Sequence, residues 1–126
     1  MTIQLALDTS AVLAYVAGST GLGELLGEVA DEKAQFAVPA VCLVEAAGML
    51  SDAAWPMLDV LAGHPNAVIT ALDADEWRHH ASAALIFDGV GNGAAALLVA
   101  QGRVPYVATA HPDVYGDGID TVFIED

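Results

Sequence analysis

Asp8 lies at the end of an apolar run and directly before two hydroxyl residues. The run Ile3–Leu7 is typical of a buried β-strand, and Thr9 and Ser10 follow the acid. An acid at the carboxyl end of a strand in a parallel sheet faces the crevice where such folds bind ligands. Its structural role would be the N-cap of a helix beginning near Ala11, a position that either hydroxyl residue could also fill. We therefore expect Asp8 to do more than cap a helix.

Glu45 is the second acid that stands apart from its neighbours. It is the only charged residue between Val38 and Leu50, a stretch that we expect to be largely buried. Burying an unpaired carboxylate is costly, so either Glu45 lies on a narrow exposed stripe of a helix or something compensates its charge. Mg²⁺ and Mn²⁺ take oxygen ligands and relieve repulsion between carboxylates. We predict a divalent cation bound by Asp8 and Glu45.

The elements that position these acids alternate between apolar runs and helical patterns. This alternation predicts an α/β fold with a central parallel sheet that is covered on both faces. The runs that predict about five strands are Ile3–Leu7, Phe36–Val38, Ala67–Ala71, Tyr106–Ala108 and Thr121–Ile124. Helical patterns cover Leu22–Ala30, Ala40–Leu50, a stretch begun near Pro56, Asp73–Leu85 and the segment GNGAAALLVAQG that ends at Gly102. We expect Asp73 to be an N-cap, with Glu76 completing a capping box.

The composition predicts one acidic domain. A chain of 126 residues, 56% of them hydrophobic, has the size of a single domain, residues 1–126. Seventeen acids against three bases give a formal net charge of −14, which repels nucleic acid and favours a partner with a basic surface. The apolar stretches are shorter than the roughly 18 residues of a spanning helix, and the N-terminus does not resemble a secretory signal. We expect a cytoplasmic protein without membrane contact, in which the single cysteine, Cys42, is a small buried hydrophobe.

Three segments, in this order, resemble the chain of a PIN domain, the nuclease fold of the VapC-type toxins in toxin–antitoxin pairs. They are LALDTSAVLAYV at residues 5–16, VPAVCLVEAAGML at 38–50 and GNGAAALLVAQGRVPYVATAHPDVY at 91–115. The similarity spans nearly the whole chain. It implies a three-layer α/β/α sandwich, usually dimeric, in which a cluster of acids holds Mg²⁺ or Mn²⁺ to cleave RNA.

The acidic positions of that family fall on two kinds of residue here. Asp8 and Glu45 match the first two acids, whereas Asn92 and His111 occupy the other two positions. The resemblance thus implies four site residues, two of which have lost their carboxylate, and each loss should weaken Mg²⁺ binding. A softer metal such as Mn²⁺, Zn²⁺ or Ni²⁺, held by Asp8, Glu45 and His111, is an alternative.

Four further residues are secondary candidates for the site. Thr109 matches a threonine near the site of the family, and it is retained together with Ser10. Asp88 and Asp113 lie within four residues of the two substituted positions, and a shifted loop would bring either into the site. Acids in such Gly- and Pro-rich segments are more often solvated than bound to metal.

The sequence leaves three functions open. We favour a PIN-like protein related to VapC-type ribonucleases, with a degenerate site and a protein-binding or regulatory role. The second is an active Mg²⁺- or Mn²⁺-dependent endoribonuclease toxin, and the third is an α/β domain with a small-molecule pocket. Expected partners are a second copy in a homodimer, through the apolar helix at Ala53–Leu61, and a small basic antitoxin or helix-turn-helix regulator. RNA is a partner only if the nuclease is active.

Overall fold

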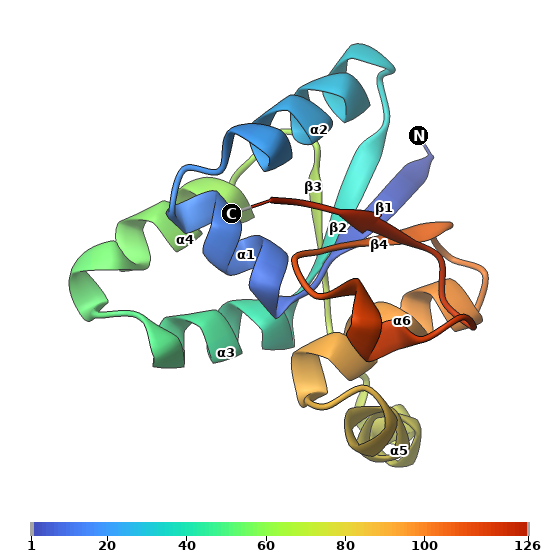
Figure 1. Ribbon diagram of the computed structural model, residues 1–126. Helices are drawn as coiled ribbons and strands as arrows, with labels where there is room; N and C mark the ends of the chain where they lie inside the picture. Colours follow the sequence, from blue (N-terminus) through green and yellow to red (C-terminus); the bar gives the residue numbers. More distant parts are fainter. Residues whose placement is uncertain (1, 126) are drawn as a thin grey trace.

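The computed structural model describes residues 2–125 as one five-stranded parallel sheet with helices on both faces (Figure 1). The strands are β1 (Ile3–Leu7), β2 (Gln35–Pro39), β3 (Ala67–Thr70), β4 (Tyr106–Thr109) and β5 (Thr121–Phe123). The α-helices are α1 (Thr9–Val16), α2 (Thr20–Asp31), α3 (Ala40–Met49), α4 (Trp55–Ala62), α5 (Trp77–Ile86) and α6 (Val90–Ala100). Short 3-10 helices are η1 (Asp52–Ala54), η2 (Ala74–Glu76) and η3 (Pro112–Tyr115).

The strand order places the ends of β1 and β4 side by side in the middle of the sheet. The order is β3-β2-β1-β4-β5, and every neighbouring pair is parallel. Leu7 of β1 pairs with Ala108 of β4, so the residues that follow these strands leave the sheet together. The chain builds outward from β1 in one direction and then returns to build in the other, so this is the switch point at which open α/β sheets bind ligands.

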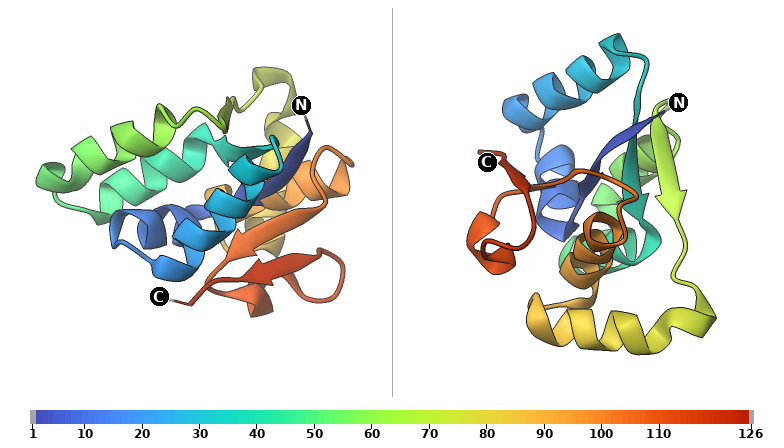
Figure 2. Two further views of the ribbon diagram at one scale, coloured as in Figure 1. Left: turned by 90° about the horizontal axis from the view of Figure 1, so that it is seen from above. Right: turned by 90° about the vertical axis from the view of Figure 1, so that its right-hand side faces the viewer.

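Alternating side chains divide the core into two layers. Leu5 and Leu7 of β1 pack with buried residues of α1 to α4, whereas Ala6 faces a second cluster that includes residues of α6 and Tyr115 of η3. Helices α1 to α4 thus lie over one face and α6 over the other, with α5 packed against α6 (Figure 2). The α/β fold with helices on both faces of a parallel sheet is confirmed.

The predicted elements are close to the observed ones, with three local corrections. Each strand ends within one residue of its prediction. The first helix begins at Thr9 rather than near Ala11, because Asp8 is its N-cap. Asp73 makes no capping hydrogen bond through its side chain, and the chain forms η2 before α5 begins at Trp77. The helix η3, between β4 and β5, was not predicted.

Within residues 2–125, no single helix combines the length and the apolar composition needed to cross a membrane. Among the same residues, two segments, Ala74–Ile86 and Val90–Ala100, reach that length and composition together, and the chain bends by 110° between them. Most residues of α6 in the second segment are buried in the fold.

Candidate functional site

Asp8 is held at the switch point by donors from its own chain. Its side chain is 1% exposed. Oδ1 accepts hydrogen bonds from the Ala11 backbone N–H at 2.9 Å and from the Ser10 hydroxyl at 2.7 Å. Oδ2 accepts one from the Tyr115 hydroxyl at 2.7 Å. Both carboxylate oxygens therefore have internal donors, and one of them satisfies an otherwise unpaired N–H in the first turn of α1.

Tyr115 is the member of the site that the sequence did not suggest. It is buried at the end of η3, and its ring stacks on Phe87 with 5.8 Å between centroids. Burial, and then the charge of Asp8 and the hydrogen bond to it, raise the pKa of the Tyr115 hydroxyl well above its ordinary value. The hydroxyl therefore stays protonated and donates to Asp8. A tyrosine six residues after the end of β4, at the end of a turn that begins with Pro112, was the available signal.

Ser10 and Thr109 connect the ends of β1 and β4. The Ser10 oxygen accepts from the backbone N–H of Ala110 at 2.9 Å and lies 3.3 Å from the Thr109 hydroxyl oxygen. The Thr109 hydroxyl in turn accepts from the backbone N–H of His111 at 2.9 Å. These two secondary candidates thus join the Asp8 network, where they fix the path of the chain after β4.

Glu45 reaches across from α3 to the start of α6. Its Oε1 accepts from the Thr9 hydroxyl at 2.7 Å and from the backbone N–H of Gly91 at 2.9 Å. Gly91 lies in the first turn of α6, where N–H groups have no partner within the helix and the helix dipole favours a negative charge. The N-cap residue Gly89 supplies no side-chain cap. Glu45 therefore performs that role from another helix, which compensates its charge.

Gly91 allows this contact because it lacks a side chain. A Cβ added there would lie 2.1 Å from the Thr9 hydroxyl oxygen and 2.3 Å from Glu45 Oε1. Gly93, two positions further along the same helix, is also close to its neighbours, since a Cβ there would lie 2.8 Å from the backbone nitrogen of Ala84 in α5. Glycine inside a helix costs about 1 kcal/mol relative to alanine, so two of them in one apolar helix indicate close approach. That was the sequence signal for this contact.

Cys42 lies beneath the same contact. Its Sγ donates to the Gly91 carbonyl oxygen at 3.4 Å, and the side chain is fully buried. Burial raises the pKa of the Cys42 thiol well above its ordinary value, the Thr9 hydroxyl opposes this shift, and the charges of Asp8 and Glu45 add to it. The thiol is therefore protonated and inert, as the sequence suggested.

Asn92 has a structural role that a carboxylate could not fill. Its amide nitrogen donates to the carbonyl oxygens of Phe87 at 3.0 Å and Asp88 at 3.4 Å, at the end of α5. Its amide oxygen faces the Tyr115 hydroxyl at 3.4 Å. An aspartate there would place acceptor against acceptor, because an ionised carboxylate has no hydrogen to donate.

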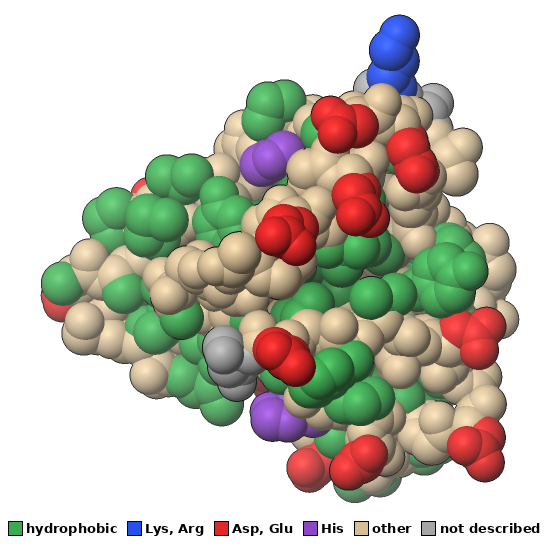
Figure 3. Space-filling view, turned by 45° about the horizontal axis from the view of Figure 1, so that its top comes forward, with side chains coloured by type: hydrophobic (Ala, Val, Ile, Leu, Met, Phe, Trp, Pro, Cys, Tyr) green, Lys and Arg blue, Asp and Glu red, His purple; other side chains and the backbone are tan. Residues whose placement is uncertain are grey.

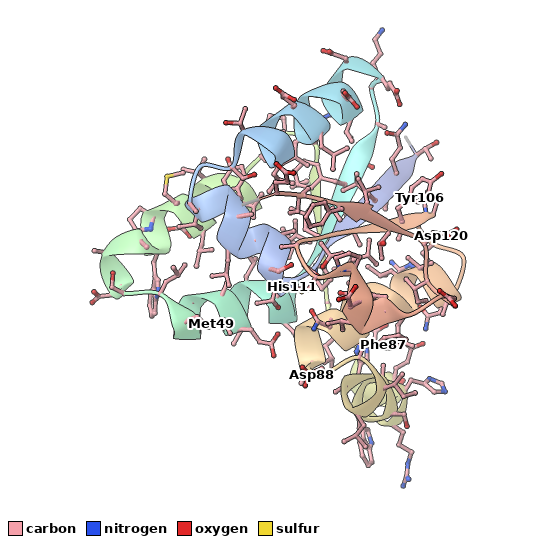
Figure 4. The ribbon with its side chains drawn as sticks, viewed as in Figure 1. Met49, Phe87, Asp88, Tyr106, His111 and Asp120 are labelled. Carbon is pink, nitrogen blue, oxygen red and sulfur yellow. The ribbon has the colours of Figure 1, made fainter. Side chains whose placement is uncertain are left out.

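The remaining candidate residues are exposed at the surface. Asp88 is exposed at the bend between α5 and α6, with a left-handed φ of 60°, and His111 is exposed just after β4 (Figure 4). Asp113 is exposed on η3. The structure therefore links Asp8, Ser10 and Thr109 through direct hydrogen bonds, and it links Asn92 to Asp8 through the Tyr115 hydroxyl. Among residues 2–125 it shows no hydrogen bond from the side chains of Asp88, His111 or Asp113.

The hydrogen bonds of the site leave few free carboxylate oxygens for a Mg²⁺ or Mn²⁺ ion. A hard dication takes six or more oxygen ligands and is held by carboxylates that are free to face it. Here both oxygens of Asp8 and one oxygen of Glu45 accept hydrogen bonds from protein donors. Within residues 2–125, no three histidine, cysteine, aspartate or glutamate side chains form a group that could hold a metal ion.

Comparison with known proteins adds no family to this description. No protein-family model matches the chain, and no curated protein matches it.

Proposed function

We propose that this protein is a PIN-like domain, related to VapC-type ribonuclease toxins, whose acidic site is degenerate and whose role is to bind or regulate a protein. The α/β fold and the order of the resembling segments support this proposal. It acts in the cytoplasm, as a homodimer that pairs through exposed apolar side chains of α3 and α4 such as Val44, Met49 and Val60.

The observation that carries the proposal is that both carboxylate oxygens of Asp8 accept hydrogen bonds from donors within the protein. A metal at Asp8 would have to share Oδ2 with the Tyr115 hydroxyl, or displace the Ser10 and Ala11 donors from Oδ1. The first arrangement places a buried, protonated hydroxyl beside the cation, and the second uncaps α1. In place of a metal, Asp8 and Glu45 each stabilise the start of a helix.

The charge of the chain supports the same conclusion. Nucleic-acid binding draws most of its affinity from cationic side chains that neutralise phosphates. This chain has three, against seventeen acids. One of them, Arg78, stacks over Trp77 on α5, with 4.7 Å between the guanidinium carbon and the ring centroid. A basic protein surface is a better electrostatic match than RNA.

An active Mg²⁺- or Mn²⁺-dependent endoribonuclease is the alternative. The observation that favours it is that the chain brings the two retained acids close together, since the hydroxyl of Thr9, the residue after Asp8, donates to Glu45. A metal ion that displaced some of these hydrogen bonds could bind the carboxylates of both Asp8 and Glu45. Asn92 and His111 would then supply a carbonyl oxygen and an imidazole.

Thermal unfolding with Mn²⁺ or Mg²⁺ titrated in separates the two functions. A ligand that binds only the folded state raises the melting temperature. We expect the wild type, Asp8→Asn and the exposed control Asp75→Asn to show the same small response to millimolar metal. Neither metal should support cleavage of RNA by the wild type.

The opposite pattern would establish the alternative. A rise in melting temperature that is present in the wild type and in Asp75→Asn, but absent in Asp8→Asn, would show metal bound at Asp8. Metal-dependent RNA cleavage that disappears in Asp8→Asn and in Glu45→Gln would show that the nuclease is active.

A further inference from the structure

A groove runs between α2 and the carboxyl-terminal strand β5. It consists of two adjoining hollows with volumes of about 430 Å³ and 360 Å³, which share Leu25, Glu28 and Val122. Because these residues line both hollows, the two lie next to each other along the helix. It lies apart from Asp8 and Glu45, which line neither hollow.

The floor of the groove is apolar and partly open to solvent. Leu25 of α2, Val122 of β5 and Tyr106 of β4 line it. Tyr106 is 44% exposed and lies at the amino end of β4 (Figure 4), and Phe123, beside the first hollow, is 58% exposed. Large side chains exposed in this way favour burial against a partner.

One wall of the groove carries a row of acids. Glu24, Glu28 and Glu32 line it at intervals of four residues, which places them on one side of α2, about 6 Å apart. All three are exposed. Figure 3 shows acidic side chains gathered over this helix, alongside a hydrophobic strip. Glu125 borders the other end of the first hollow.

This row is electrostatically unfavourable in the isolated chain. Like charges four residues apart on a helix repel each other, and the helix dipole disfavours negative charge at the carboxyl end. The last turn of α2 contains no basic residue, and the partner of Glu32 is the neutral amide of Gln4. The neighbouring base, Lys33, follows the helix in a left-handed conformation.

We propose that this groove binds a basic amphipathic segment of a partner protein, with cations about 6 Å apart facing the acidic row and apolar side chains on the floor. Charge complementarity carries the assignment, because cations would relieve both the repulsion within the row and the unfavourable dipole interaction. The proposal rests on the protein-binding role proposed above and names the site and the chemistry of that partner.

The other candidate occupants have the wrong charge. A second copy of the chain carries the same net charge of −14, and its three bases are scattered at Lys33, Arg78 and Arg103. Nucleic acid and anionic lipid would both meet the acidic row with like charge. A cation-bearing protein segment fits both the wall and the floor.

Binding of a designed peptide tests the groove. The probe is a fluorescently labelled twelve-residue peptide that alternates lysine and leucine, and its titration is followed by anisotropy. An alternating peptide in an extended conformation presents its lysines about 7 Å apart on one face. Two control peptides, one alternating lysine with serine and one alternating glutamate with leucine, remove the apolar and the cationic contributions in turn.

Paired variants locate the binding. Glu24→Gln with Glu28→Gln removes two charges from the groove, whereas Asp75→Asn with Asp117→Asn removes two exposed charges that do not line it. Val122→Ser removes apolar floor. We expect the groove pair and Val122→Ser each to weaken binding about tenfold, corresponding to about 1.4 kcal/mol, and the control pair to change it less than twofold. Circular dichroism melts confirm that each variant is folded.

Two results would overturn the proposal. The first is equal weakening by the groove pair and the control pair, which would mean that the peptide responds only to net charge. The second is binding of the lysine–serine peptide as tight as that of the lysine–leucine peptide, or no binding of either. Failure of the underlying function is distinguishable, because it would be metal-dependent RNA cleavage, which the Asp8→Asn experiment detects whatever the peptide does.

Discussion

The acids at the switch point and the acids along α2 have opposite surroundings. Asp8 and Glu45 accept five hydrogen bonds from hydroxyl and backbone donors within the chain. Glu24 and Glu28 are exposed on a helix whose last turn has no base to offset them. The acids at the switch point accept hydrogen bonds from within the protein, whereas Glu24 and Glu28 face solvent.

The comparison shows that the position of a carboxylate in a fold does not determine its availability. A buried acid must find donors to be tolerated, and each donor occupies a lone pair that is then no longer open to another ligand. An exposed acid is solvated by water and needs no donors from the protein, so it can pair with a cationic partner at low cost in free energy. The donors around each acid therefore decide its role.

Filling the space beside Glu45 should have the largest effect on the free energy of unfolding. We expect Gly91→Ala to lower the free energy of unfolding by about 3 kcal/mol or more, because the added Cβ would overlap the Thr9 hydroxyl and the Glu45 carboxylate. The measurement is urea unfolding followed by circular dichroism.

Gly27→Ala, on α2, is the matched control. A Cβ at Gly27 meets nothing within 4 Å, so this change should stabilise the helix by about 0.5 to 1 kcal/mol. Equal effects of the two substitutions would show that the contact between Glu45 and Gly91 is loose.

Removing the Tyr115 hydroxyl should have an intermediate effect. We expect Tyr115→Phe to cost about 1 to 3 kcal/mol, since it leaves a buried oxygen of Asp8 without its donor. In a double-mutant cycle with Asp8→Asn, the coupling free energy should be about 1 to 2 kcal/mol, measured by urea unfolding.

The partly exposed Tyr106 provides the control for this cycle. Tyr106→Phe should change stability by less than about 0.5 kcal/mol. Additive effects of the Asp8 and Tyr115 substitutions would show that the hydroxyl does not serve the carboxylate, which would leave Asp8 free to bind a metal.

Neutralising one acid of the α2 row should have the smallest effect, with the opposite sign. We expect Glu28→Gln to raise stability by about 0.2 to 0.5 kcal/mol at low salt, because it removes like-charge repulsion at both Glu24 and Glu32. The gain should shrink in 1 M NaCl, where exposed charges are screened. A loss of stability, or a gain that is independent of salt, would mean that Glu28 is already paired within the chain.

The fold was largely predictable, because each strand of a buried parallel sheet is a short apolar run with a clear end. The runs at Ile3–Leu7 and Tyr106–Ala108 identified the central strands to within one residue. The periodicity that carries this information is local. It also placed Asp8 at the carboxyl edge of the sheet, where the structure has it.

The environment of the site was not predictable in the same way. The sequence gives no distance between Asp8 and Tyr115, which are 107 residues apart and meet only because β1 pairs with β4. Nor does it show that the N–H of Gly91 would compensate Glu45. The metal assignment for these two acids stays a prediction, made from charges whose donors lie far away in the chain.

Chemical labelling of Cys42 can report how often the native structure opens. Cys42 is the single thiol of the chain, and its hydrogen bond to Gly91 places it where α3 and α6 meet. A thiol reagent can reach it only when α3 and α6 separate. The rate of labelling in the native protein therefore reports how often this contact between the two helices opens. Partners or ions that stabilise the contact between α3 and α6 would slow this labelling rate. The measurement therefore needs neither a substrate nor a known ligand.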